Sequence, residues 1–267
     1  MAPTDNLSLF GEEEAPRRVR LTYSGIRLFE ECPWAYHRST TQGVAQKRLR
    51  YYILLGNMLH GVLGELTNLP ASERTTDRAI ELVHRRWPKW PDAEAENEDA
   101  WKLRSEQMVR SFVDRGGASG NIAARETPFE IARSAYSIQG RIDRIDRLDD
   151  TTFKIVEYKF GDENPPELDE VIGDHQWVIY WLGAERLMRP FGLRPEAFVF
   201  HFLNAESTIE FSPNAEMLQS AIARLEDAAA SIIDAVEYPA RRNYQCASCF
   251  FDIVCPLRRG PGSTRSR

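Results

Sequence analysis

Two acidic residues and a lysine stand where they could bind a metal ion and act on a phosphate ester. Glu157 and Lys159 are two positions apart in the segment Ile155–Lys159, and in a β-strand residues with this spacing point to the same face. Asp143 lies in the preceding segment, Gly140–Asp146, and a hairpin would bring its carboxylate alongside. Carboxylate oxygens hold divalent cations, which lower the pKa of a bound water and neutralise phosphate charge. The pattern therefore indicates phosphodiester hydrolysis.

The acid-x-Lys pair also has a simpler interpretation, a solvent-facing hairpin with a cross-strand ion pair. Further residues favour a functional site. Gly161 follows Lys159 closely, and His60 lies on an early expected helix. Gln176 and Tyr180 are four positions apart on the helix expected after the hairpin. Each has a structural alternative: His60 as a buried, hydrogen-bonded histidine, and the other two as polar residues of an amphipathic helix.

Six residues, in the same order along the chain, resemble the motif series of the RecB-like PD-(D/E)xK nucleases: His60, Asp143, Glu157, Lys159, Gln176 and Tyr180. The resemblance covers roughly residues 20–257. It implies a restriction-endonuclease-like core with a central mixed sheet. It also implies a Mg²⁺ or Mn²⁺ site with four ligands: His60, Asp143, Glu157 and the backbone carbonyl of Tyr158.

In the same resemblance, Lys159 would orient or activate the attacking water, while Gln176 and Tyr180 would contact DNA or support the site. One departure is that Ile142 stands where the superfamily's name has proline. Two other acids are secondary candidates, Glu126 and Asp146. Because Asp146 is three positions from Asp143, an undistorted strand would turn it to the opposite face, where an ion pair is the expected role.

Four cysteines form a second candidate metal site. Cys246, Cys249 and Cys255 make a C-x2-C-x5-C cluster, and Cys32 lies far earlier. In a reducing cytoplasm such a cluster is more often a metal site than a disulfide framework. Four thiolates suit tetrahedral zinc or an iron–sulfur cluster, and their spacing leaves both open. The arrangement resembles AddB-type nucleases and the CRISPR Cas-four exonucleases, which implies a 4Fe-4S cluster. Four unrelated buried cysteines are the alternative.

The elements that must position these residues follow from hydrophobic periodicity. A helix is expected from a cap at Thr22 or Ser24. The other expected helices are 50–67, 72–87, 94–115, 169–188 and 215–236. The expected strands are 127–133, 136–148, 152–160, 197–203 and 208–211, with a tight turn at Asp149 and Asp150. This order predicts an α/β (α+β) fold, a mixed sheet flanked by helices.

The predicted organisation is a single nuclease domain over residues 21–257, between a tail at 1–20 and a loose tail at 258–267. Within it we expect a helical part at about 21–120, a sheet core at about 121–211, and a C-terminal helix with the cysteine cluster at 212–257. The chain has 267 residues, 42% of them hydrophobic, which allows a sizeable core. No apolar run is long enough to span a bilayer, so we expect a cytoplasmic protein.

The expected partner is DNA, as single strands or ends, and a helicase or CRISPR integrase would fit the resemblance. The net charge of −6 argues against a nucleic-acid partner, but acidic metal ligands contribute to it, so charge leaves the question open. The segment Asn6–Phe10, with Leu7, Leu9 and Phe10, resembles a sliding-clamp docking peptide; a chance apolar island is the alternative. Two other functions stay open, a binding module without catalysis and a structural zinc protein.

Overall fold

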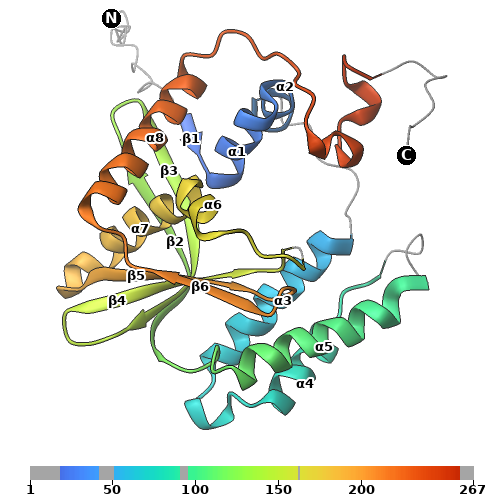
Figure 1. Ribbon diagram of the computed structural model, residues 1–267, viewed down its shortest axis with the longest axis vertical. Helices are drawn as coiled ribbons and strands as arrows, with labels where there is room; N and C mark the ends of the chain where they lie inside the picture. Colours follow the sequence, from blue (N-terminus) through green and yellow to red (C-terminus); the bar gives the residue numbers. More distant parts are fainter. Residues whose placement is uncertain (1–18, 42–50, 91–95, 162, 259–267) are drawn as a thin grey trace, which may run out of the picture.

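The computed structural model describes residues 19–41, 51–90, 96–161 and 163–258 (Figure 1). Leu7, Leu9 and Phe10 lie outside them, so the clamp-docking hypothesis stays a prediction. The first described element is a short strand, β1 (Val19–Leu21). The predicted tail at 1–20 is therefore too long by Val19 and Arg20, because a strand this short carries no periodicity of its own.

Helices form the first part of the chain. Helix α1 (Tyr23–Glu31) begins after Thr22, whose hydroxyl accepts a hydrogen bond from Gly25 N at 3.1 Å, as the cap predicted. Short helical turns follow, α2 (Pro33–Tyr36) and a π-helix (His37–Thr41). The next helices are α3 (Tyr51–Asn68), α4 (Thr76–Arg86) and α5 (Glu98–Asp114), with a 3-10 turn (Ala71–Glu73) between the first two.

Within the described residues the central sheet has six strands and is mixed, as predicted. Its strands are β1, β2 (Asn121–Ala132), β3 (Tyr136–Arg147), β4 (Thr152–Lys159), β5 (Arg194–Phe202) and β6 (Ser207–Phe211). The order is β1-β3-β4-β5-β6, and β2 also pairs with β3. The β1–β3 and β4–β5 pairs are parallel and the others antiparallel. The β3–β4 turn forms where predicted, with the Asp149 carboxylate accepting from Thr151 N and Thr152 N at 2.7 and 2.8 Å.

The helices of the second half are α6 (Leu168–Gly173), α7 (His175–Met188) and α8 (Ala215–Ile233), with 3-10 turns at Arg189–Phe191, Tyr244–Ser248 and Asp252–Val254. The prediction of a single helix at 169–188 is wrong, because the helix is interrupted at Asp174. This residue is extended (ψ 148) and its carboxylate caps α7 by accepting from Gln176 N at 2.6 Å. Aspartate competes for backbone donors in this way, which favours a new helix start over continuation.

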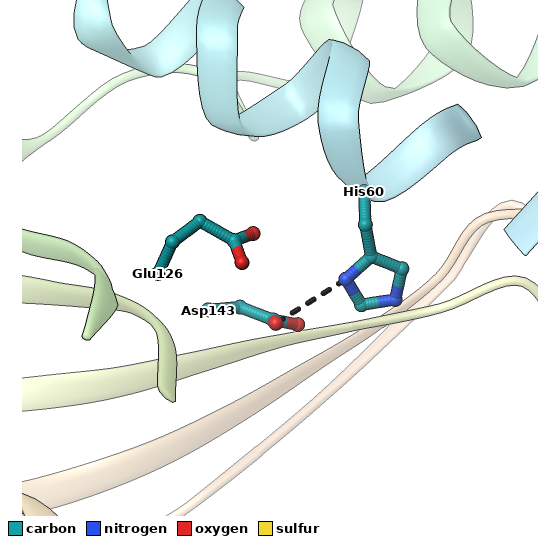
Figure 2. Close-up of side chains that lie close together, drawn as sticks. All are labelled: His60, Glu126 and Asp143. Atoms are coloured by element: carbon teal, nitrogen blue, oxygen red, sulfur yellow. Dashed lines mark ion pairs between the residues drawn. The ribbon is translucent and has the colours of Figure 1, made fainter. Parts of the chain in front are cut away.

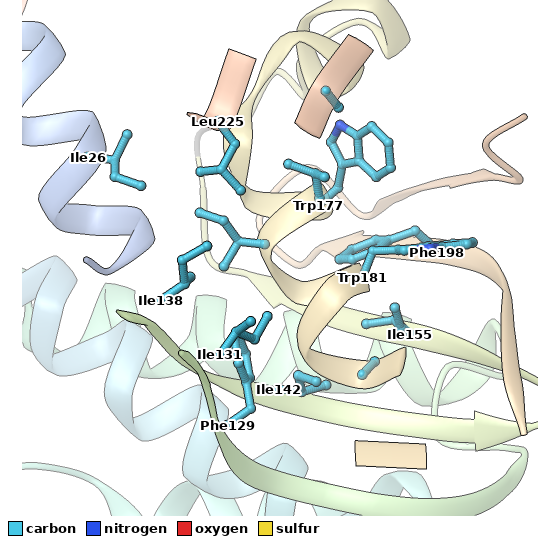
Figure 3. Close-up of a cluster of buried hydrophobic side chains, with 14 of the residues drawn as sticks. Ile26, Phe129, Ile131, Ile138, Ile142, Ile155, Trp177, Trp181, Phe198 and Leu225 are labelled. Carbon is cyan, nitrogen blue, oxygen red and sulfur yellow. The ribbon is translucent and has the colours of Figure 1, made fainter. Parts of the chain in front are cut away.

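Two apolar cores cover the two faces of the sheet. Helices α1, α7 and α8 pack on one face, where Ile26, Trp177 and Leu225 belong to one buried cluster with Ile155 of β4 (Figure 3). Helices α3, α4 and α5 pack on the other, against Val156 and Tyr158 of the same strand. Because side chains alternate between the two faces of a strand, consecutive residues of β4 lie in different cores. None of the described helices is long and apolar enough to cross a membrane.

Candidate active site

Asp143 is fixed by the β3–β4 hairpin. It is 5% exposed, and its Oδ2 accepts a hydrogen bond from the backbone N–H of Tyr158 at 2.9 Å. This cross-strand bond places the first acid of the series beside Glu157, as the hairpin predicted. The backbone carbonyl of Tyr158 stays a predicted ligand.

His60 reaches the same acid from α3. Its Nδ1 lies 3.2 Å from Oδ1 of Asp143, so the two oxygens of Asp143 face different elements. Glu126 approaches from β2 (Figure 2). His60, Glu126 and Asp143 each offer a ligand atom, and these atoms lie within 4.8 Å of one another. The three side chains therefore form a group that can hold a hard divalent cation.

Glu126 was a secondary candidate in the sequence, but the structure places it in the candidate metal group. Its φ is +43°, a conformation that non-glycine residues rarely adopt. Oε2 of Glu126 lies 3.0 Å from Nε of Arg141. The other oxygen of Glu126, Oε1, is buried and has no hydrogen-bond partner among the described residues. Burial, and secondarily the charge of Asp143, raises the pKa of Glu126. A strained acid with an unpaired buried oxygen fits a metal ligand. The positive φ of Glu126 could not be predicted from the residue types.

Glu157 is the most buried acid of the site, 3% exposed. Its Oε1 accepts from Gln176 Nε2 at 2.6 Å and lies 3.4 Å from Lys159 Nζ. Its Oε2 is buried and has no partner within the described part of the chain. Burial, followed by the charge of Asp143, raises the pKa of Glu157 well above its ordinary value. A cation at Oε2 would remove both penalties, so the acid fits a metal site.

Lys159 and Tyr180 complete the predicted series. The Lys159 ammonium lies over two aromatic rings, 5.6 Å from the centroid of Tyr23 and 5.9 Å from that of Phe200. Tyr180 lines the cavity. Burial, then the charge of Glu157, raises the pKa of its phenol, which stays protonated. Tyr23 had no sequence signal, because its contact with Lys159 joins segments over a hundred positions apart.

The site opens into a cavity of about 760 Å³. Asp143 and Glu157 line it from the sheet, and Asn57, His60 and Gly61 line it from α3. Asp146 is elsewhere: it is buried against Arg144, with Nε to Oδ1 at 2.6 Å. The expected ion-pair role of Asp146 is confirmed.

The cysteines lie in a second region, the cysteine segment, which we define as residues 241–257. Its side chains hold the end of α1: Asn243 Nδ2 donates to the Glu31 carbonyl and Gln245 Nε2 to the Glu31 carboxylate, both at 2.9 Å. All four cysteines are free thiols. Burial raises the pKa of the Cys249 thiol, and the charges of Cys32, Cys246 and Cys255 add to the shift.

A mixed sheet with flanking helices bears a cavity lined by His60, Asp143 and Glu157, with Lys159 held against Glu157, an arrangement that suits metal-assisted phosphodiester hydrolysis. The sequence profile of the PD-(D/E)XK nuclease superfamily matches residues 20–256. The chain belongs to this superfamily and is a nuclease that hydrolyses phosphodiester bonds.

A solved structure shares the fold. The crystal structure of a candidate exonuclease from Eubacterium rectale has a TM-score of 0.52 at 10% sequence identity, covering 96% of this chain and 100% of that chain. A second structure, SSO0001, is 19% identical, with a TM-score of 0.34, covering 69% of this chain and 95% of that chain. Among curated proteins, none matches the chain significantly.

Proposed function

We propose that the chain is a Mg²⁺- or Mn²⁺-dependent DNA nuclease acting as an exonuclease on single strands or ends, in repair, recombination or CRISPR adaptation. The observation that supports this most is the convergence of His60, Asp143 and Glu157 on one cavity, with Lys159 held against Glu157. Acids brought together by burial are costly unless a cation or substrate uses them.

Each group has a separable role in this proposal. The metal ligands would be His60, Asp143, Glu157, the Tyr158 carbonyl and Glu126. A bound divalent cation would polarise the scissile phosphate and lower the pKa of the attacking water. Lys159 orients that water with its ammonium, and Gln176 holds the Glu157 carboxylate in place through the 2.6 Å hydrogen bond. Tyr180 faces the cavity and can donate to a phosphate oxygen.

The test compares wild type with Lys159→Ala on 5′- and 3′-labelled single-stranded DNA, with Mn²⁺ and with EDTA. We expect cleavage that needs Mn²⁺ and falls on the order of 10²- to 10⁴-fold in the variant, as for loss of a group that moves a proton. Circular single-stranded DNA separates exonuclease from endonuclease action, because it has no ends. Equal cleavage by the variant would refute the assigned site, and metal-independent binding without cleavage would favour the non-catalytic module.

For the cysteine segment we propose a structural 4Fe-4S cluster held by Cys32, Cys246, Cys249 and Cys255. Four cysteines that form no disulfide, three of them in a C-x2-C-x5-C cluster, suit a thiolate-bound centre. Anaerobic purification followed by an absorbance spectrum and metal analysis tests this. A brown protein with four irons per chain is the expected result, and a colourless protein with one zinc would replace the cluster by the tetrahedral alternative.

A further inference from the structure

Helix α3 has glycine at an interior position that faces the cavity, although glycine weakens a helix interior. Gly61 follows His60 directly and lines the cavity with it. A Cβ atom at this position would lie 2.8 Å from Nη1 and 3.4 Å from Cζ of Arg86. The side chain of Arg86, from the last residue of α4, therefore lies against the backbone of α3 in the space that a larger residue would take.

One carboxylate, that of Glu65, holds Arg86 there together with its neighbour Arg85. Arg86 Nε lies 2.9 Å from Oε2 of Glu65, and Arg85 contacts Oε1. The hydrogen bond to Arg86, first among the causes, lowers the pKa of Glu65, so the carboxylate is ionised. Two guanidinium groups thus share one negative charge, which leaves the trio with a net positive charge.

The two arginines differ in what they face. Arg86 lines the cavity that contains Asp143 and Glu157, whereas Arg85 does not. The ion pair uses Nε of Arg86, and its terminal nitrogens have no hydrogen-bond acceptor among the described residues. A planar guanidinium whose two terminal NH2 groups are free to donate is suited to two oxygens of one phosphate.

Other arginines of the cavity are engaged differently. Arg141 is paired with Glu126, a candidate metal ligand. Arg125 donates Nε to the Thr67 carbonyl at 2.8 Å. Arg86 is held by Glu65, an acid that also lines the cavity but lies outside the candidate metal group, and its position is set by contact with the backbone of α3 beside His60.

We propose that Arg86, positioned by Gly61 and Glu65, binds a backbone phosphate of the DNA strand next to the scissile bond. The proposal rests on the nuclease acting on DNA and adds a substrate-binding residue to its site. Arg85, which shares Glu65 but lies outside the cavity, takes no part in binding.

The experiment measures binding of a fluorescent single-stranded oligonucleotide by anisotropy, in Lys159→Ala protein so that no cleavage interferes, with Mn²⁺ present. We expect Arg86→Ala to weaken binding by about tenfold or more, as for loss of a charged hydrogen bond. The slope of log affinity against log salt should become shallower by about 0.7. Arg85→Ala, which also removes one partner of Glu65, should leave both quantities unchanged.

Gly61→Ala separates positioning from stability. Alanine favours the helix over glycine, so thermal stability should not fall, while the displaced Arg86 should weaken binding. Its effect should not add to that of Arg86→Ala, because both act through one side chain. With active enzyme, Arg86→Ala should raise KM more than it lowers kcat.

Equal binding by the Arg86→Ala and Arg85→Ala proteins would overturn the phosphate assignment while leaving the nuclease site intact. Additive effects of Gly61→Ala and Arg86→Ala would overturn the positioning by Gly61. If the parent protein neither binds nor, with Lys159 restored, cleaves DNA, the proposed function fails and this inference with it.

Discussion

The carboxylate site and the cysteine segment are both candidate metal sites, but the chain holds them in different ways. Asp143 and Glu157 are buried on neighbouring strands and fixed by hydrogen bonds from Tyr158 N and Gln176. The cysteine segment consists of short 3-10 turns, and Cys246 is exposed. Its hydrogen bonds to α1 involve polar side chains at the surface. The sheet therefore preorganises the first site, whereas the second depends more on the group it binds.

Loss of metal should therefore affect the two regions differently. Without a cation, the carboxylate site keeps its geometry but pays for its buried charges. Without its centre, the cysteine segment keeps Phe251, packed on Trp34, as its buried apolar residue, and we expect it to loosen. Activity is thus expected to follow the first region and stability the second.

The largest effect on activity is expected for Glu157→Gln, which removes a candidate metal ligand but keeps its shape. We expect kcat to fall about 10³-fold or more, corresponding to several kcal/mol of charge stabilisation. The folded pKa of Glu157 is raised above its ordinary 4.5, so ionisation costs folding free energy as the pH rises above that value. The metal-free variant should therefore be at least as stable as wild type at pH 7, measured by thermal unfolding with EDTA. A large loss of stability would contradict a preorganised site.

A smaller loss of activity is expected for Gln176→Ala, because Gln176 holds Glu157 rather than the metal. Removal of such a supporting hydrogen bond weakens metal binding or activity about 10- to 100-fold. Titration of cleavage with Mn²⁺ should show a higher metal requirement. An unchanged metal requirement would show that Gln176 acts on DNA instead.

Tyr23 lies on α1, the helix whose C-terminal end the cysteine segment contacts. Its hydroxyl donates to Asp174 at 3.0 Å, and its ring lies beside Lys159. Tyr23→Leu removes the ring and should lower kcat about fivefold, within the range of a cation–π contact. Tyr23→Phe keeps the ring and should recover most of that loss. Equal effects of the two substitutions would show that the hydroxyl, not the ring, matters.

The smallest effect on the rate of folded enzyme is expected for Cys249→Ser, at the farther end of the comparison. We expect kcat per folded molecule to change by less than about threefold, since the contacts of α1 with α7 do not involve the segment. Thermal stability should fall by about 2–5 kcal/mol if a thiolate-bound centre is lost. Hydrogen exchange should accelerate first over residues 241–257. A loss of cleavage equal to that of Glu157→Gln would erase the distinction between the two regions.

Much of the fold and part of the site could be predicted because they depend on local geometry. The two-residue spacing of Glu157 and Lys159 places them on one face of any strand. Thr22 and Asp149 have side chains that bond to nearby backbone N–H groups, which fixed a helix start and a turn. The strand β1 was not predicted because an element of three residues has no hydrophobic periodicity. The helix break at Asp174 was not predicted because a capping residue within an apolar run can be taken for part of the helix interior.

Residue types and their order along the chain were enough to predict which residues could do the chemistry. Three contacts became known from the folded structure: His60 on α3 lies beside Asp143 on β3, Glu126 joins them with a positive φ, and Arg86 lies across Gly61. Spacing along a strand is a property of neighbouring residues, since the backbone repeats every two positions. Convergence of distant segments depends on how the two apolar cores pack on the sheet, and that packing involves residues from many elements at once.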